Sequence, residues 1–118
     1  MRSIKLLENK LANSQHVSSP LNLPRRTEWI LRVISSELNG TPKIYIEEGF
    51  SSSSQPPSEN EWTTLPNHIN GTDYFEITDD LVRVNSSHFA ANWARIRYEP
   101  MENSTGLVSA IFSYKDYI

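Results

Sequence analysis

Thr27–Ser35 reads TEWILRVIS, and this stretch decides the fold class. Its side chains alternate, so that an extended backbone has one wholly apolar face and one mixed face. The apolar face holds Trp29, Leu31 and Val33, and the mixed face holds Ile30, Arg32 and Ile34. β-Branched and aromatic residues favour strands, and the turn pair Asn39-Gly40 follows. The stretch therefore predicts a β-strand with its apolar face in a core.

A second alternating segment follows that turn. Lys43–Glu48 (KIYIEE) places its two isoleucines on one face and its polar and tyrosine side chains on the other. The turn-rich connection Leu38–Pro42 lies between the two segments. Because short turn-rich connections usually join adjacent antiparallel strands, we expect these two strands to form a hairpin.

Seven further short apolar runs are separated by turn residues, and none has the period of an amphipathic helix. They are Ile4–Leu7, Val17–Leu23, Trp62–Leu65, Tyr74–Ile77, Leu81–Asn85, Ala94–Tyr98 and Gly106–Tyr114. In the last run, either Val108, Ala110 and Phe112 or Leu107 and Ile111 suit burial. The pattern predicts an all-β antiparallel β-sandwich, jelly-roll-like or immunoglobulin-like, with eight or nine short strands and no significant helix.

The length of 118 residues predicts one β-sandwich domain over residues 1–118. Pro20 interrupts Val17–Leu23, which is therefore predicted to be an edge strand or an irregular one. Residues 1–24 are expected to form an irregular arm that contacts a neighbouring molecule. Phe50–Glu61 contains four consecutive serines and a Pro-Pro pair, which suit neither a strand nor a helix. Residues 50–61 are therefore predicted to form a flexible, exposed loop.

Composition and charge exclude several classes of protein. The formal net charge is −3 and the pI about 5.6, which argues against a domain that binds nucleic acid. The absence of cysteine excludes disulfides and cysteine-based metal sites. No continuous apolar run resembles a signal peptide or spans a bilayer, so we expect synthesis in the cytoplasm and no membrane partner.

No residue pattern indicates catalysis. The histidines His16, His68 and His88 lack metal-ligand spacing, and no serine lies in a nucleophile motif. Asp79 and Asp80 leave open a glycosidase or a calcium site, but adjacent acids in turns are usually solvated. We predict no enzyme activity, no catalytic residue, no cofactor and no metal.

The candidate binding residues are aromatic and basic. Trp93 is out of phase with the apolar face of its strand and is predicted to be exposed, whereas Trp29 and Trp62 are predicted core residues. Arg95 and Arg97 share one face of that strand and can pair with cross-strand acids or contact an anionic partner. The predicted interface consists of Trp93, Arg95, Arg97, Tyr45 and Phe50.

Taken in order, six segments resemble a family of small bacteriophage virion proteins with a β-sandwich fold. They are Ser18–Leu23 (SSPLNL), Glu28–Val33 (EWILRV), Tyr45–Gly49 (YIEEG), Trp62–Leu65 (WTTL), Ala94–Tyr98 (ARIRY) and Gly106–Ala110 (GLVSA). The chain departs from the family's pattern where Phe50–Glu61 expands a short turn and where Asp73–Asn85 is longer. The resemblance implies a structural or decorating component of a phage particle and implies no catalytic residues.

These observations lead to two expectations about function. The first is a structural protein of a bacteriophage virion, on the head, neck, tail or fibre base, present in several copies and bound to other virion proteins. The alternative is a carbohydrate-binding module that adheres to a host surface glycan through Trp93, Tyr45 or the Phe50–Glu61 loop.

Overall fold

The computed structural model describes residues 2–23, 28–67, 71–86, 91–101 and 103–115. Within them the chain forms ten strands and one short 3₁₀ helix, η1 (Glu59–Glu61), with no α-helix in this part of the chain. The strands are β1 (Arg2–Leu11), β2 (His16–Val17), β3 (Leu21–Asn22), β4 (Glu28–Ser36), β5 (Lys43–Gly49), β6 (Trp62–Thr64), β7 (Phe75–Glu76), β8 (Leu81–Ser86), β9 (Trp93–Glu99) and β10 (Leu107–Lys115). The all-β prediction is confirmed.

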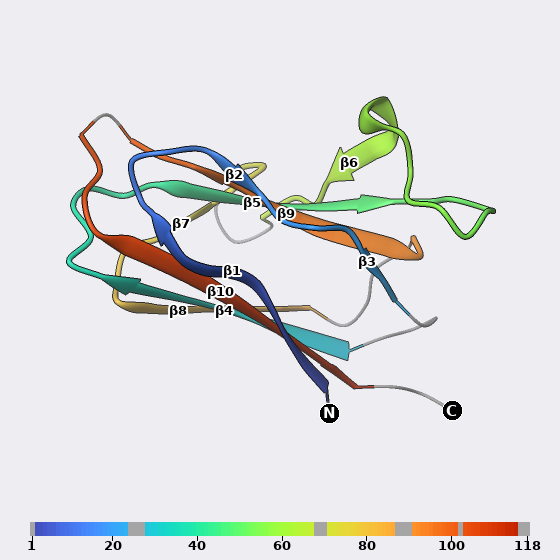
Figure 1. Cartoon of the computed structure of the whole chain (residues 1–118), viewed down its shortest axis with the longest axis horizontal. Helices are drawn as coiled ribbons and strands as arrows, with labels where there is room; N and C mark the ends of the chain where they lie inside the picture. Colours follow the sequence, from blue (N-terminus) through green and yellow to red (C-terminus); the bar gives the residue numbers. More distant parts are fainter. Residues whose placement is uncertain (1, 24–27, 68–70, 87–90, 102, 116–118) are drawn as a thin grey trace.

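The strands form two antiparallel sheets that pack face to face (Figure 1). The first sheet, the lower layer of the view, has the order β1-β10-β4-β8. The second sheet has the order β2-β9-β5-β6, with β3 also paired to β9 and β7 also paired to β5. If β2 with β3 and β6 with β7 each count as one interrupted strand, the order is that of an eight-stranded jelly roll. The β-sandwich is thus of the jelly-roll kind.

The predicted hairpin is wrong. β4 pairs with β10 and β8 in the first sheet, whereas β5 pairs with β9, β6 and β7 in the second. The connection between them crosses from one sheet to the other, with Glu37 and Gly40 both at positive φ. Both strands bury alternate residues, but they do so by facing each other across the core. Alternation indicates the buried face of a strand and carries no information about its partner.

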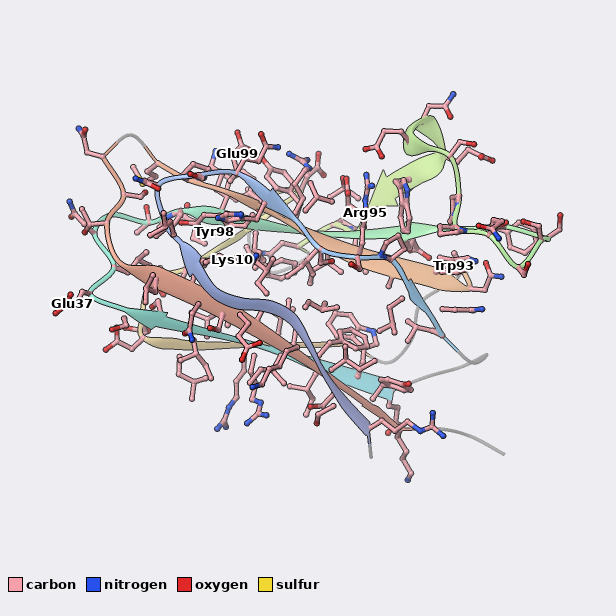
Figure 2. The ribbon with its side chains drawn as sticks, in the orientation of Figure 1. Lys10, Glu37, Trp93, Arg95, Tyr98 and Glu99 are labelled. Atoms are coloured by element: carbon pink, nitrogen blue, oxygen red, sulfur yellow. The ribbon has the colours of Figure 1, made fainter. Side chains whose placement is uncertain are left out.

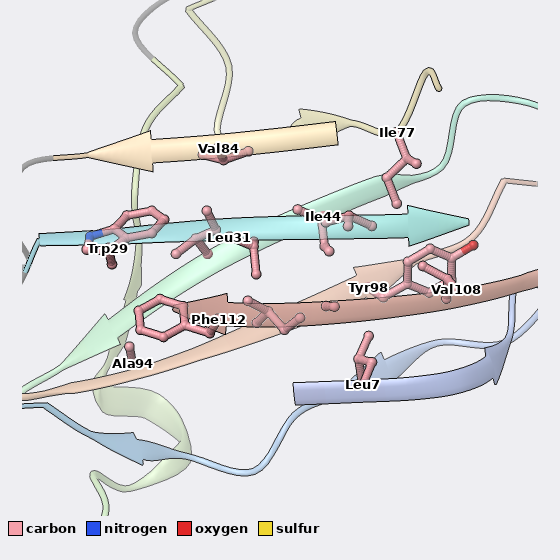
Figure 3. Close-up of a cluster of buried hydrophobic side chains, with 14 of the residues drawn as sticks. Leu7, Trp29, Leu31, Ile44, Ile77, Val84, Ala94, Tyr98, Val108 and Phe112 are labelled. Carbon is pink, nitrogen blue, oxygen red and sulfur yellow. The ribbon is translucent and has the colours of Figure 1, made fainter. Parts of the chain in front are cut away.

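The core lies between the sheets and is built from the inward side chains of both (Figure 3). Trp29, Leu31 and Val33 are buried, as the sequence predicts. On β10 the sequence left two sets of residues as candidates for burial. Val108, Ala110 and Phe112 are the buried set, whereas Leu107 is exposed. The core cluster consists of Leu7, Ala12, Leu23, Trp29, Leu31, Val33, Ile44, Ile46, Ile77, Val84, Ala94, Ile96, Tyr98, Val108, Ala110, Phe112 and Tyr114.

The amino-terminal segment differs from the expected irregular arm. β1 pairs with β10 along its whole length, with two irregularities in register, and forms one edge of the first sheet. β2 and β3 pair with β9 on either side of Pro20, as two short edge strands. The buried Tyr98 hydroxyl donates to the Ala12 carbonyl at 2.6 Å and holds the crossing between the sheets. Residues 2–23 are therefore part of the sandwich of their own chain.

Candidate functional site

The outer face of the second sheet carries four of the five predicted binding residues: Tyr45, Trp93, Arg95 and Arg97. β5 and β9 are in a register that sets Glu47 opposite Arg95 and Tyr45 opposite Arg97. Arg95 Nε donates to Glu47 Oε1 at 2.8 Å, and both side chains are buried. The guanidinium of Arg97 lies 4.0 Å from the centre of the Tyr45 ring. The cross-strand ion pairing left open by the sequence is therefore present.

Arg95 is also bound from the predicted loop. Its Nη1 and Nη2 donate to the two carboxylate oxygens of Glu59 at 3.0 and 2.9 Å, and the guanidinium lies 4.4 Å from the centre of the Trp62 ring. Trp62 belongs to this outer face and not to the core cluster, so its predicted core position is wrong. The reason is register. Trp62 lies opposite Gly49, which shares the outward phase of Glu47, whereas Ile46 has the inward phase. The arginine is thus neutralised within its own chain.

Trp93 is a second correction, because its side chain is only 7% exposed. It shares the outward phase of Arg95, is not part of the core cluster and lies opposite Gly49. Figure 2 labels both Trp93 and Arg95 on β9. The Asn92 side chain accepts from Ser51 N at 3.1 Å and donates to Ser51 O at 2.9 Å, which fixes the start of the loop beside the indole. Within the described residues the indole Nε1 has no hydrogen-bond partner. Trp93 is therefore buried on the outer face, next in sequence to the residue that anchors the start of the loop.

The loop is exposed along most of its length, as expected, and is anchored at several points. Pro57 is buried against Gly49, and Ser58 N donates to Glu61 Oε1 at 3.0 Å at the start of η1. Phe50 is 66% exposed, the largest value among the exposed apolar side chains. Of the five predicted binding residues, Phe50 alone offers an open apolar surface. Elsewhere on the outer face of the second sheet, Arg95 and Arg97 pair with Glu47 and lie over the rings of Trp62 and Tyr45.

The Glu59 contact makes a testable prediction about pH. The two hydrogen bonds from Arg95 lower the pKa of Glu59 from its usual value of 4.5, so the contact persists above that value and is lost as pH falls through the lowered pKa. We expect a carboxyl-carbon NMR titration to show a lowered Glu59 midpoint that returns towards 4.5 in Arg95→Met. Glu61 is an internal control, because its pKa is lowered by hydrogen bonds from Ser58 and is expected not to respond. A Glu59 midpoint that is unchanged in the variant would contradict the contact.

The outer face of the first sheet carries an exposed apolar band that the sequence reasoning missed. Leu11 lies opposite Leu107, and Ile34 lies opposite Leu81. Leu107 pairs with Ser36, two residues from Ile34 on the same face, so the four side chains run across all four strands. They are 59%, 37%, 41% and 45% exposed in the order named. The band thus holds four of the seven exposed large apolar side chains of the described residues, and such clustering marks interaction surfaces.

Beside the apolar band, two arginines lie directly opposite each other. Arg32 of β4 pairs in register with Arg83 of β8, two positions along both strands from Ile34 and Leu81. Neither makes an ion pair with any residue that the structure describes. Together with Ser3, Ile30 and Ser113 they line a hollow of about 330 Å³. Like charges directly opposite on neighbouring strands destabilise a sheet, so this pair calls for a cause outside the sheet itself.

The sequence did contain a signal for this surface. Leu81–Val84 alternates, but Leu81 and Arg83 occupy the outward phase while Val84 is buried. An apolar residue in an outward phase is informative only when it has apolar neighbours, and those come from strands far away in the chain. Their neighbourhood depends on the pairing of β4 with β8 and β10, which alternation alone does not reveal.

The candidate catalytic and metal-binding residues are not brought together. Asp79 and Asp80 are exposed in the turn before β8, and their backbone carbonyls accept hydrogen bonds from Ser35. His16 stacks on Tyr98 with ring centres 5.9 Å apart, while His68 and His88 lie outside the described residues. Among the residues that are described, no three histidine or acidic side chains cluster as a metal site. That part of the chain also contains no helix of the length and apolarity needed to cross a membrane.

The chain matches no protein-family model, and no curated protein matches it at significant similarity.

Proposed function

We propose that this chain is a non-catalytic assembly domain that attaches to another protein through the outer face of its first sheet. The observation that carries the proposal is the apolar band of Leu11, Leu107, Ile34 and Leu81. Burying such side chains against a partner removes apolar area from water, which is the main favourable term in protein association. The apolar band lies between polar and charged side chains, as the core of a protein interface does within its rim.

We further propose that the particle it assembles into is a bacteriophage virion, with several copies of the chain bound to other virion proteins. The support is the ordered resemblance of six sequence segments, which span Ser18 to Ala110. The jelly roll accommodates this role, because viral capsid proteins use it, but lectins use it too. The fold is therefore compatible with both functions, and the distinction between them has to be argued from the residues of the site.

The site favours assembly over glycan binding. Stacking on a sugar ring needs an open aromatic face, but Trp93 is buried and the face of Tyr45 is occupied by Arg97. Trp62 is likewise covered by Arg95. The aromatic residues proposed for the glycan alternative are thus engaged within the chain, apart from Phe50.

The proposal is tested by following the chain into particles. We expect mass spectrometry of phage particles made from the genome that encodes the chain to find it as a stoichiometric component. The double variant Ile34→Ser/Leu81→Ser removes two exposed apolar side chains without touching the core. We expect it to fold normally by circular dichroism and to be incorporated at least about tenfold less, since losing 1.4 kcal/mol of binding is a tenfold change.

Two further variants locate the interface. Val17→Ser changes an exposed apolar residue of the second sheet and is expected to leave incorporation unchanged. Phe50→Ser tests the competing surface on the loop. Loss of incorporation in Phe50→Ser with none in the double variant would move the interface to the loop. A chain that is absent from purified particles would contradict the virion role altogether.

A further inference from the structure

We infer that the hollow between Arg32 and Arg83 receives a carboxylate from an acidic segment of the protein partner. This inference rests on the proposed function, because it names the chemistry of the partner that docks on the same face. The hollow and the apolar band are adjacent, since one step of two residues along β4 leads from Ile34 to Arg32. One extended segment can therefore reach both.

The first argument is the charge of the pair itself. A guanidinium carries a fixed positive charge and presents planar, paired N–H donors that fit a carboxylate. Arg32 and Arg83 face each other across neighbouring strands, and no acidic side chain of the described residues pairs with either. A carboxylate placed between them would turn two repelling charges into a hydrogen-bonded anion site.

The second argument is the contrast with the other pair of arginines in this chain. Arg95 and Arg97 lie on β9, and Glu47 of β5 makes an ion pair with each of them. Glu59 pairs with Arg95, and Glu99 pairs with Arg97. Where arginines have a structural role here, the chain supplies the carboxylates. Arg32 and Arg83 lack this complement within the described residues, although they occupy a comparable position on the first sheet.

The third argument concerns the class of partner. The adjacent apolar band suits a protein segment that carries apolar side chains, and a nucleic-acid backbone has none to offer. A second copy of the chain, docked with its two-fold axis at the hollow, would set the arginine pairs against each other, which costs free energy. The best match is a foreign segment with leucine-like and acidic residues.

The spacing of the two features specifies the probe. Alternate residues of an extended chain face the same way and are about 6.8 Å apart, which is also the spacing between the Ile34–Leu81 and Arg32–Arg83 rows. The probe is a synthetic peptide of repeated Leu-Ser-Glu-Ser, labelled with a fluorophore. Its matched control has Gln in place of Glu. We expect the Glu peptide to bind at least about tenfold more tightly by fluorescence anisotropy, because a carboxylate adds an opposite charge and a second acceptor oxygen that the Gln amide lacks.

The variants tie this preference to the arginines. Arg32→Gln/Arg83→Gln is expected to abolish the preference for Glu, whereas Lys10→Gln/Lys43→Gln removes the same charge elsewhere and keeps it. Arg83→Gln alone should raise the thermal midpoint by about 1–5 °C, because it relieves the repulsion, while it weakens peptide binding. A residue with a purely structural role would move the two readouts in the same direction.

Several results would overturn the inference. Equal binding of the Glu and Gln peptides would show that no acidic segment is recognised. Tighter binding of an oligothymidine 12-mer would point to nucleic acid instead. If Ile34→Ser/Leu81→Ser loses incorporation into particles while Arg32→Gln/Arg83→Gln retains it, the carboxylate site is wrong and the assembly function stands. If both retain it, the assembly face itself is wrong.

Discussion

Replacing Arg95 by methionine is expected to lower the free energy of unfolding by about 3–5 kcal/mol, the usual cost of removing one partner of a buried ion pair. Glu47, whose side chain is 9% exposed, would lose its 2.8 Å hydrogen bond from Arg95. Only the longer ion pair would remain, at 3.7 Å from Arg97 Nε to Glu47 Oε2, with Arg97 also held over the Tyr45 ring. Urea denaturation followed by circular dichroism measures the change.

A double variant separates the cost of removing one partner from the net contribution of the ion pair to stability. In Glu47→Met/Arg95→Met both charges are removed, and we expect most of the lost stability to return, since apolar residues of similar volume often replace buried pairs at little cost. Glu59→Gln is the matched control at the exposed end of the same network, with a much smaller expected effect. A double variant as unstable as Arg95→Met would show that packing of the arginine stem dominates.

Replacing Gly106 by alanine is the second change with a large expected effect, about 3 kcal/mol of lost stability. Gly106 has φ +90°, and an added Cβ would overlap the Ser36 carbonyl oxygen and lie 2.7 Å from that of Glu37. Backbone atoms cannot rotate away, so the turn before β10 must shift, and left-handed strain adds to the cost of overpacking. The shift would also disturb the 3.0 Å hydrogen bond from Ala12 N to Gly106 O.

Gly71→Ala is the matched control. Gly71 also has a positive φ, +69°, but nothing lies within 4 Å of the position of an added Cβ. Its substitution therefore carries only the conformational cost of about 1–2 kcal/mol. Thermal unfolding of both variants measures the difference. Equal losses would mean that the close approach of Gly106 to the strand end at Ser36 contributes little.

The strands and their buried faces follow from the sequence almost completely. Thr27–Ser35 predicts β4 and its inner face, and structure confirms both for Glu28–Ser35, with Thr27 outside the described residues. The same holds for β5 and for β9, where the inward residues include Ile96 and Tyr98. The reason is local: a strand has a period of two residues, and a one-residue slip would expose the whole apolar set.

The sequence predicted only part of the candidate site. Pairing of Arg95 and Arg97 with acids was among the options, because Glu47 alternates with the two isoleucines of β5. The sequence did not predict the burial of Trp93. Ser51, which binds the neighbouring Asn92, belongs to the loop after β5, 41 residues earlier in the chain. The alternation within a strand tells which face of the sheet a side chain lies on. Whether that side chain is exposed to solvent depends on the segments that pack around it.

By itself the sequence determined the all-β class, the strand positions and the inward residues, because each depends on alternation within a few neighbouring residues. The tertiary structure decided which strands are neighbours. In the tertiary structure β4 and β5 belong to different sheets. The same strand order brings Leu11, Ile34, Leu81 and Leu107 together in one band. It also set Arg32 against Arg83, which lie 51 positions apart in the chain. Such contacts arise from the strand order of the jelly roll, a property of the whole packed chain that no local pattern encodes.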